Sequence, residues 1–129
     1  MKTKVLLVDD EPDFLDVMQA ALQSWGFEVI LAQDGKQALE AVKTKKPSVV
    51  VLDYMMPVMN GVETLKKLRK IEATLPVILF TAHPNEDNMG NALGLRVSAF
   101  VPKLSEYTDT QSALKTALKL IEKNLNKGE

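Results

Sequence analysis

Three aspartates stand directly after apolar segments that have the length of a β-strand. Asp9 and Asp10 follow Val5–Val8, and Asp53 follows Val49–Leu52. A single aspartate after a strand is most often a turn former or a helix cap, so the prediction of a site depends on the three together. Two like charges about 4 Å apart repel each other by roughly 4 kcal/mol at an effective dielectric of about 20. Three converging carboxylates therefore need a cation beside them, and an all-oxygen set of ligands favours Mg²⁺ over zinc.

Thr81 and Lys103 occupy similar positions after two later apolar segments. An aspartate beside a divalent cation can attack a phosphoryl group, while a lysine neutralises the phosphoryl oxygens and a hydroxyl donates a hydrogen bond to one of them. Asp53 is the best candidate for the nucleophile because it ends the most hydrophobic segment. Asp9 and Asp10 are adjacent and are better placed to hold the metal ion.

The segments that must position these residues alternate between strand and helix. The strand-like runs are rich in β-branched residues and lack polar alternation, which is typical of strands buried on both faces. They are Val5–Val8, Val29–Ala32, Val49–Leu52, Val77–Phe80 and Ala99–Val101. Because the carboxyl ends of parallel strands form the ligand-binding edge of an open sheet, the polar residues after these runs should meet there.

Segments with helical spacing lie between the strands, and most have a recognisable start. Pro12 opens the first, which stops at Gly26, and Asp34 opens the second, with Gln37 three residues later. Asn60 and Thr108 open two more. A further helix, around residues 86–93, is poorly marked. The pattern predicts an α/β fold: a doubly wound, five-stranded parallel sheet with five helices.

Length and composition agree with one compact domain. The 129 residues suit a single domain over residues 1–129, with an ordered core over about 3–124 and a frayed tail over 125–129. Lys and Arg number 16 against 17 Asp and Glu, so we expect no direct nucleic-acid partner. Cysteine is absent, and the apolar run near the start is too short for a signal peptide or a membrane span. We therefore expect a cytoplasmic protein with no membrane partner.

The sequence closely resembles the receiver domains of bacterial two-component response regulators. The matching segments are "VLLVDDEPDF", "GFEVILAQDGKQALEAV", "PSVVVLDYMMPVMNGVETLKKLR", "LPVILFTAH" and "AFVPK". The resemblance implies a flavodoxin-like sheet in the order 2-1-3-4-5. It also implies phosphorylation by a sensor histidine kinase or a histidine phosphotransfer protein, with a signal passed to a downstream protein or output domain.

By position, the resemblance makes Asp53 the phosphoacceptor. Asp10 resembles the direct Mg²⁺ ligand, and Asp9 resembles the ligand that acts through water. Met55 resembles the residue whose main-chain carbonyl completes the metal site. The implied cofactor is Mg²⁺.

The resemblance also implies a switch. Thr81 resembles the hydroxyl residue that turns toward the phosphoryl group, Phe100 the aromatic residue that changes orientation, and Lys103 the lysine of the family's site. Two departures from the family pattern are visible. Leu104 follows Lys103 where the family usually has proline, and Gly94 lies six residues before Phe100, which looks like a two-residue extension.

The function expected from these features is a phosphorelay switch. It would catalyse only its own phosphotransfer and autodephosphorylation, and no output domain is expected within residues 1–129. The main alternative is a pseudo-receiver, a binding module that keeps the fold without phosphorylation. An aspartate-dependent phosphohydrolase would need a second acid at position 55, where methionine stands, and a nucleotide-binding module would need glycines in place of the acidic "DDEPDF".

Overall fold

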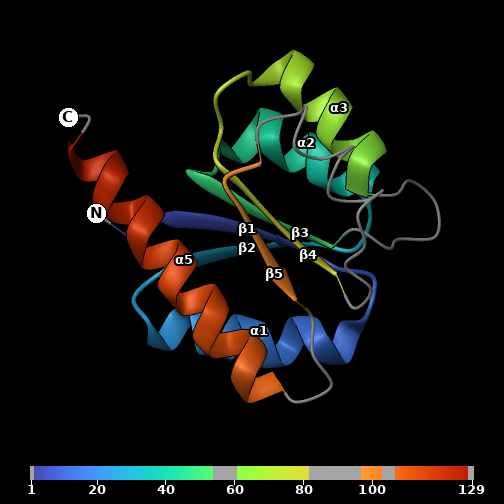
Figure 1. The fold of residues 1–129 in the computed structure, drawn as a ribbon. Helices are drawn as coiled ribbons and strands as arrows, with labels where there is room; N and C mark the ends of the chain where they lie inside the picture. The colour runs from blue at the N-terminus through green and yellow to red at the C-terminus, as the bar shows by residue number, and fades with distance from the viewer. Residues whose placement is uncertain (1, 54–60, 82–96, 103–106, 128–129) are drawn as a thin grey trace.

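The computed structural model describes residues 2–53, 61–81, 97–102 and 107–127 (Figure 1). Its centre is a five-stranded parallel sheet in the order β2-β1-β3-β4-β5, as the sequence and the family resemblance predict. The strands are β1 (Lys4–Val8), β2 (Glu28–Ala32), β3 (Val49–Asp53), β4 (Val77–Thr81) and β5 (Ala99–Pro102).

The helices cover both faces of the sheet (Figure 1). They are α1 (Pro12–Ser24), α2 (Gly35–Lys45), α3 (Gly61–Ile71) and α5 (Tyr107–Lys127). α1 and α5 pack on one face around a core that includes Phe14 and Leu118, and α2 and α3 pack on the other around a core that includes Val42 and Leu65. The helix expected around residues 86–93 lies outside the described residues.

Three of the predicted helix boundaries are confirmed in atomic detail. Pro12 is the first residue of α1, and Gly26 stands just beyond its end with a φ of 96°, a conformation that favours glycine. At the start of α2, the carboxylate of Asp34 accepts a hydrogen bond of 2.8 Å from the amide of Gln37. The side chain of Gln37 in turn accepts one of 2.9 Å from the amide of Gln33, so this helix start is closed from both directions.

The boundaries predicted for the other two helices are confirmed only in part. α3 begins at Gly61, and the expected cap Asn60 lies outside the described residues. α5 begins at Tyr107, one residue before the predicted start at Thr108. The helix continues to Lys127, inside the segment 125–129 in which the sequence predicts fraying.

Burial separates the central strands from the edge. Every residue of β3 is buried, as are Val5–Val8 of β1. β2 is different, because only Ala32 is buried while Leu31 is 38% exposed. The prediction of burial on both faces is therefore wrong for β2, which is an edge strand with a neighbouring strand on one side only.

Among the described residues, none of the helices is both long and apolar enough to cross a lipid bilayer.

Candidate functional site

Asp9 lies immediately after β1 and is completely buried. Its amide donates a hydrogen bond of 3.1 Å to the carbonyl of Ala32, at the end of β2. Its Oδ1 atom accepts a hydrogen bond of 2.8 Å from the amide of Glu11, and its Oδ2 atom is buried as well. Both the main chain and the carboxylate of Asp9 are thus fixed at the carboxyl edge of the sheet.

Asp53 is the last residue of β3, and its side chain is 3% exposed. Val8 pairs with Leu52, so the next residues along the two strands, Asp9 and Asp53, are neighbours at the same edge. On its other side Asp53 is in register with Phe80 of β4. Because every residue of β3 is buried, Asp53 stands at the end of a strand that is packed along its whole length.

The structure brings the three predicted acids together. One carboxylate oxygen from each of Asp9, Asp10 and Asp53 can be chosen so that all three lie within 4.8 Å of one another. Asp9 and Asp53 are buried, whereas Asp10 is exposed at the mouth of the cluster. The prediction that these side chains converge is confirmed.

This acidic cluster fits a hard divalent cation. All three groups offer carboxylate oxygen, the ligand type that Mg²⁺ prefers, and repulsion between them favours a positive ion. The exposed position of Asp10 leaves one side of the cluster accessible from solvent. The receiver domains that the sequence resembles use Mg²⁺ in their phosphorylation chemistry, and the acidic cluster offers ligands of the type that this ion takes.

Of the other predicted site residues, the structure describes two and leaves two outside the described ranges. Thr81 is the last residue of β4, one position beyond the partner of Asp53. Phe100 lies in β5 in register with Leu79, and its half-buried ring packs against the core on the α2 and α3 face. Met55 and Lys103, with the Lys103–Leu104 bond, lie outside the described residues.

One feature of the site was missed from the sequence, namely the role of Glu11. Its amide holds Asp9 in an Asx turn, so Asp9 both forms a turn and belongs to the acidic cluster. The sequence contains a signal for this turn in "DDEP". Asp9 stands two residues before Glu11, and Glu11 directly precedes Pro12, the first residue of the helix.

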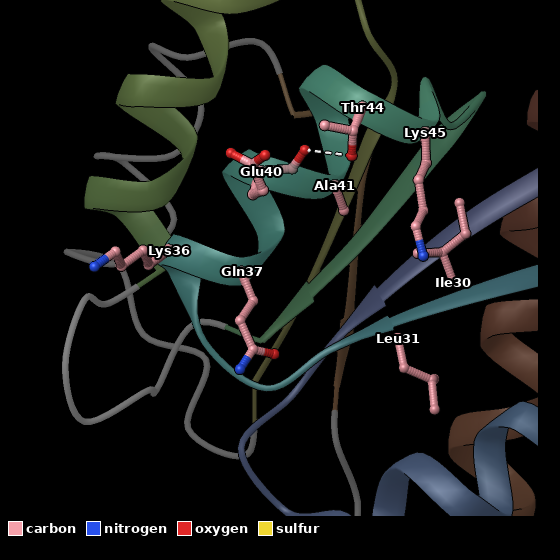
Figure 2. Close-up of a pocket in the computed structure, with 8 residues that line it drawn as sticks. All are labelled: Ile30, Leu31, Lys36, Gln37, Glu40, Ala41, Thr44 and Lys45. Carbon is pink, nitrogen blue, oxygen red and sulfur yellow. Dashed lines mark hydrogen bonds between the residues drawn. The ribbon is translucent and has the colours of Figure 1, made fainter.

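A separate groove of about 430 Å³ lies between β2 and α2 (Figure 2). Ile30 and Leu31 contribute from the strand, and Lys36, Glu40 and Lys45 contribute from the helix. None of the clustered aspartates lines it. Its charges are mixed, so the groove points to no particular class of ligand.

Comparison with known sequences identifies the family. The model of the response regulator receiver domain matches residues 5–118. The chain is 41% identical over 102 residues to the transcriptional regulatory protein CpxR of Escherichia coli (strain K12), covering 78% of this chain and 42% of CpxR. It is 37% identical over 99 residues to the alkaline phosphatase synthesis transcriptional regulatory protein PhoP of Bacillus subtilis (strain 168), covering 77% of this chain and 40% of PhoP. The chain spans half or less of the length of these relatives.

Solved structures agree with the sequence comparison. A CheY-like response regulator receiver domain protein from Methanospirillum hungatei JF-1 superposes with a TM-score of 0.84 at 25% identity, covering 96% of this chain and 99% of the other. The receiver domain of the Francisella response regulator 1452 gives a TM-score of 0.85 at 27% identity, with the same coverage of both chains. The fold, the acidic cluster at its carboxyl edge and the match over residues 5–118 together show that the chain belongs to the family of response regulator receiver domains of two-component systems.

Proposed function

We propose that Asp53 accepts a phosphoryl group from a phosphohistidine donor in a Mg²⁺-dependent reaction. The observation that carries the proposal is the acidic cluster, in which a buried carboxylate on the central strand β3 lies beside two others. Membership of the receiver family supports the same chemistry. The donor would be a sensor histidine kinase or a histidine phosphotransfer protein.

Asp53 is the best nucleophile of the three acids. The Oδ1 atom of Asp9 is engaged by the amide of Glu11, which makes Asp9 part of the turn. Asp10 is exposed and precedes the helix, whereas Asp53 is held by a strand that pairs on both sides. In the reaction, an oxygen of Asp53 attacks phosphorus, the P–N bond of the donor breaks, and its electron pair returns to the imidazole.

Asp9, Asp10, Asp53 and the main-chain carbonyl of Met55 would hold the ion. When bound, Mg²⁺ neutralises the charge of the carboxylates and of the phosphoryl oxygens. Burial of Asp9 and Asp53 keeps their carboxylates in fixed positions, and Lys103 would supply a further positive charge. The protein would be no enzyme in the usual sense, because it catalyses only its own phosphotransfer and autodephosphorylation.

The proposed consequence of phosphorylation is a change in protein contacts. Thr81 would turn toward the phosphoryl group and Phe100 would change orientation, which shifts the balance between two arrangements of the surface. The half-buried position of Phe100, in register with the strand that ends at Thr81, supports this link. Several relatives are named as transcriptional or DNA-binding regulators, and the chain spans only part of them. Within residues 1–129 we propose protein partners, no direct contact with nucleic acid or membrane, and a cytoplasmic location.

The test is incubation with acetyl phosphate, with and without Mg²⁺, followed by measurement of the intact mass. We expect a Mg²⁺-dependent gain of one phosphoryl group that is absent in Asp53→Asn. Asp34→Asn is the matched control, because asparagine also caps a helix and position 34 lies outside the acidic cluster. No modification of the unaltered protein under any of these conditions would favour the pseudo-receiver, and full modification of Asp53→Asn would contradict the choice of nucleophile.

A further inference from the structure

The outward side of α5 carries a basic surface that the acidic cluster does not touch. Its members line a hollow of about 470 Å³ and form what we call the α5 lysine surface: Lys115, Thr116, Lys119, Leu120 and Lys123. The lysines recur at intervals of four residues, which places them along one side of the helix. Leu114 and Leu118 are buried in the core between the helix and the sheet.

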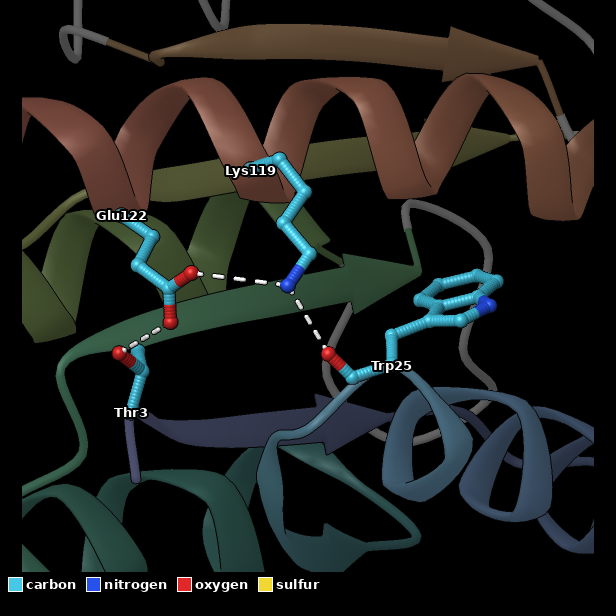
Figure 3. A network of polar contacts seen from close by, with 4 residues as sticks. All are labelled: Thr3, Trp25, Lys119 and Glu122. Carbon is cyan, nitrogen blue, oxygen red and sulfur yellow. Dashed lines mark hydrogen bonds and ion pairs between the residues drawn. The ribbon is translucent and has the colours of Figure 1, made fainter. Parts of the chain in front are cut away.

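All of the charged residues that line this surface are positive. Three of the five residues that line the hollow are lysines and none is acidic. The whole sequence has 16 basic and 17 acidic residues, so this is a local concentration of positive charge. The carboxylate of Glu122, beside this surface, already has two partners within the protein. Its Oε2 atom accepts a hydrogen bond of 2.7 Å from the hydroxyl of Thr3, and its Oε1 atom lies 3.7 Å from Nζ of Lys119 (Figure 3).

Two of the lysines contact aromatic rings of neighbouring segments, and Lys119 is also held by a hydrogen bond. Nζ of Lys119 donates a hydrogen bond of 2.9 Å to the carbonyl of Trp25, at the end of α1 (Figure 3). The same atom lies 4.9 Å from the ring centre of Phe27. Nζ of Lys115 lies 5.8 Å from the ring centre of Trp25. A partner that binds here would lose less side-chain entropy than it would on a surface of unrestrained lysines.

Leu120 gives the surface an apolar centre. It is 60% exposed, more than any other large exposed hydrophobic residue among those that the structure describes. A single exposed leucine is ordinary on a protein surface, but this one lines the same hollow as the three lysines. A nucleic-acid backbone offers negative charge without an apolar group for such a centre, whereas an acidic peptide segment can offer both.

We propose that the α5 lysine surface binds an acidic, amphipathic segment of a partner protein. Carboxylates of the segment face Lys115, Lys119 and Lys123, and an apolar side chain covers Leu120. The surface contains none of the aspartates of the candidate site, so the proposal does not depend on phosphorylation of Asp53.

The test uses a designed helical peptide with glutamates at intervals of four residues and leucines beside them, and a scrambled peptide of the same composition. Trp25 is the only tryptophan and lies next to Lys115, so its fluorescence reports binding without a label. We expect saturable binding of the designed peptide that weakens with salt, and much weaker binding of the scrambled one.

Variants locate the binding. Lys115→Glu with Lys123→Glu should weaken binding about tenfold, and Leu120→Ala about fivefold. Lys66→Glu with Lys67→Glu, on the exposed side of α3, changes the net charge equally and should leave the affinity within about twofold.

Three results would overturn the proposal. The first is no binding of the designed peptide, and the second is equal loss of affinity in the α3 control. The third is preferential binding of a single-stranded oligonucleotide, or of vesicles containing phosphatidylglycerol, through the same lysines. Leu120→Ala removes only an exposed side chain, so its effect can be measured in a folded protein even if the charge reversals disturb Lys119.

Discussion

At the scale of single residues, the acidic cluster is a compromise between function and stability. Three carboxylates within 4.8 Å of one another repel, and two of them are also buried. A site of this kind stores unfavourable electrostatic energy until a cation arrives. The Asx turn at Asp9 holds one of the acids in place despite that repulsion.

Replacement of Asp10 by asparagine should therefore have two opposite effects. Without Mg²⁺ the variant should be more stable, because one repelling charge is gone. Its free energy of unfolding should rise by about 0.5–1 kcal/mol, and it should melt at a higher temperature. With millimolar Mg²⁺ the unaltered protein should gain more stability than the variant, because binding to the folded state stabilises it. Thermal melts of both proteins with and without Mg²⁺ measure this.

The control is Asp13→Asn, which alters an exposed acid outside the cluster. If Mg²⁺ stabilised Asp10→Asn as much as the unaltered protein, Asp10 would not be a ligand.

The sequence predicted the convergence of Asp9, Asp10 and Asp53 because parallel strands end at one edge of a sheet. It did not predict how Asp9 is fixed, since the hydrogen bond from the amide of Glu11 depends on the geometry of the turn. The parts assigned to Thr81, Lys103 and Met55 stay predictions.

At the scale of elements, local sequence signals set where helices begin and end. Asp34 and Gln37 close the start of α2, and Gly26 allows the chain to leave α1 and enter β2. Each of these signals depends on residue types within a few positions of one another, so they could be predicted from the sequence. The exposure of β2 could not, because its apolar composition resembles that of the central strands and only its place in the sheet distinguishes it.

Replacement of Asp34 by alanine should lower the free energy of unfolding by about 1 kcal/mol, because the amide of Gln37 loses its acceptor. Asp34→Asn should retain most of the stability. Urea denaturation measures both. Equal stability of the alanine variant and the unaltered protein would mean that the cap contributes nothing.

Replacement of Gly26 by alanine should also cost about 1 kcal/mol. A Cβ atom at this position would meet no atom within 4 Å, so the cost comes from the φ of 96° and involves no clash. Asparagine tolerates this conformation better, so Gly26→Asn should be the milder change. If alanine and asparagine are equally well tolerated in urea denaturation, backbone conformation is not what selects glycine here.

At the scale of the whole molecule, two cores share one sheet. The core on the α1 and α5 face and the core on the α2 and α3 face both include residues of β1, β3 and β4. A sheet that is common to both cores should couple them into one cooperative unit. The same coupling would let a change at the carboxyl edge reach both faces.

Leu65→Ala tests this coupling. Leu65 is fully buried on the α3 side, so the substitution should lower the free energy of unfolding by about 2–5 kcal/mol. Trp25 packs against the opposite core, yet its fluorescence transition should shift as far as the circular-dichroism transition. A Trp25 transition that stays in place would show that the two faces unfold separately.

The central claim is that Asp53 carries the phosphoryl group, and its most direct test is chemical trapping. After incubation with acetyl phosphate and Mg²⁺, borohydride reduces an aspartyl phosphate to homoserine, and peptide mass spectrometry then locates the altered residue. We predict homoserine at position 53, and none there when Mg²⁺ is omitted. Homoserine at position 9 or 10, or at no position, would contradict the account.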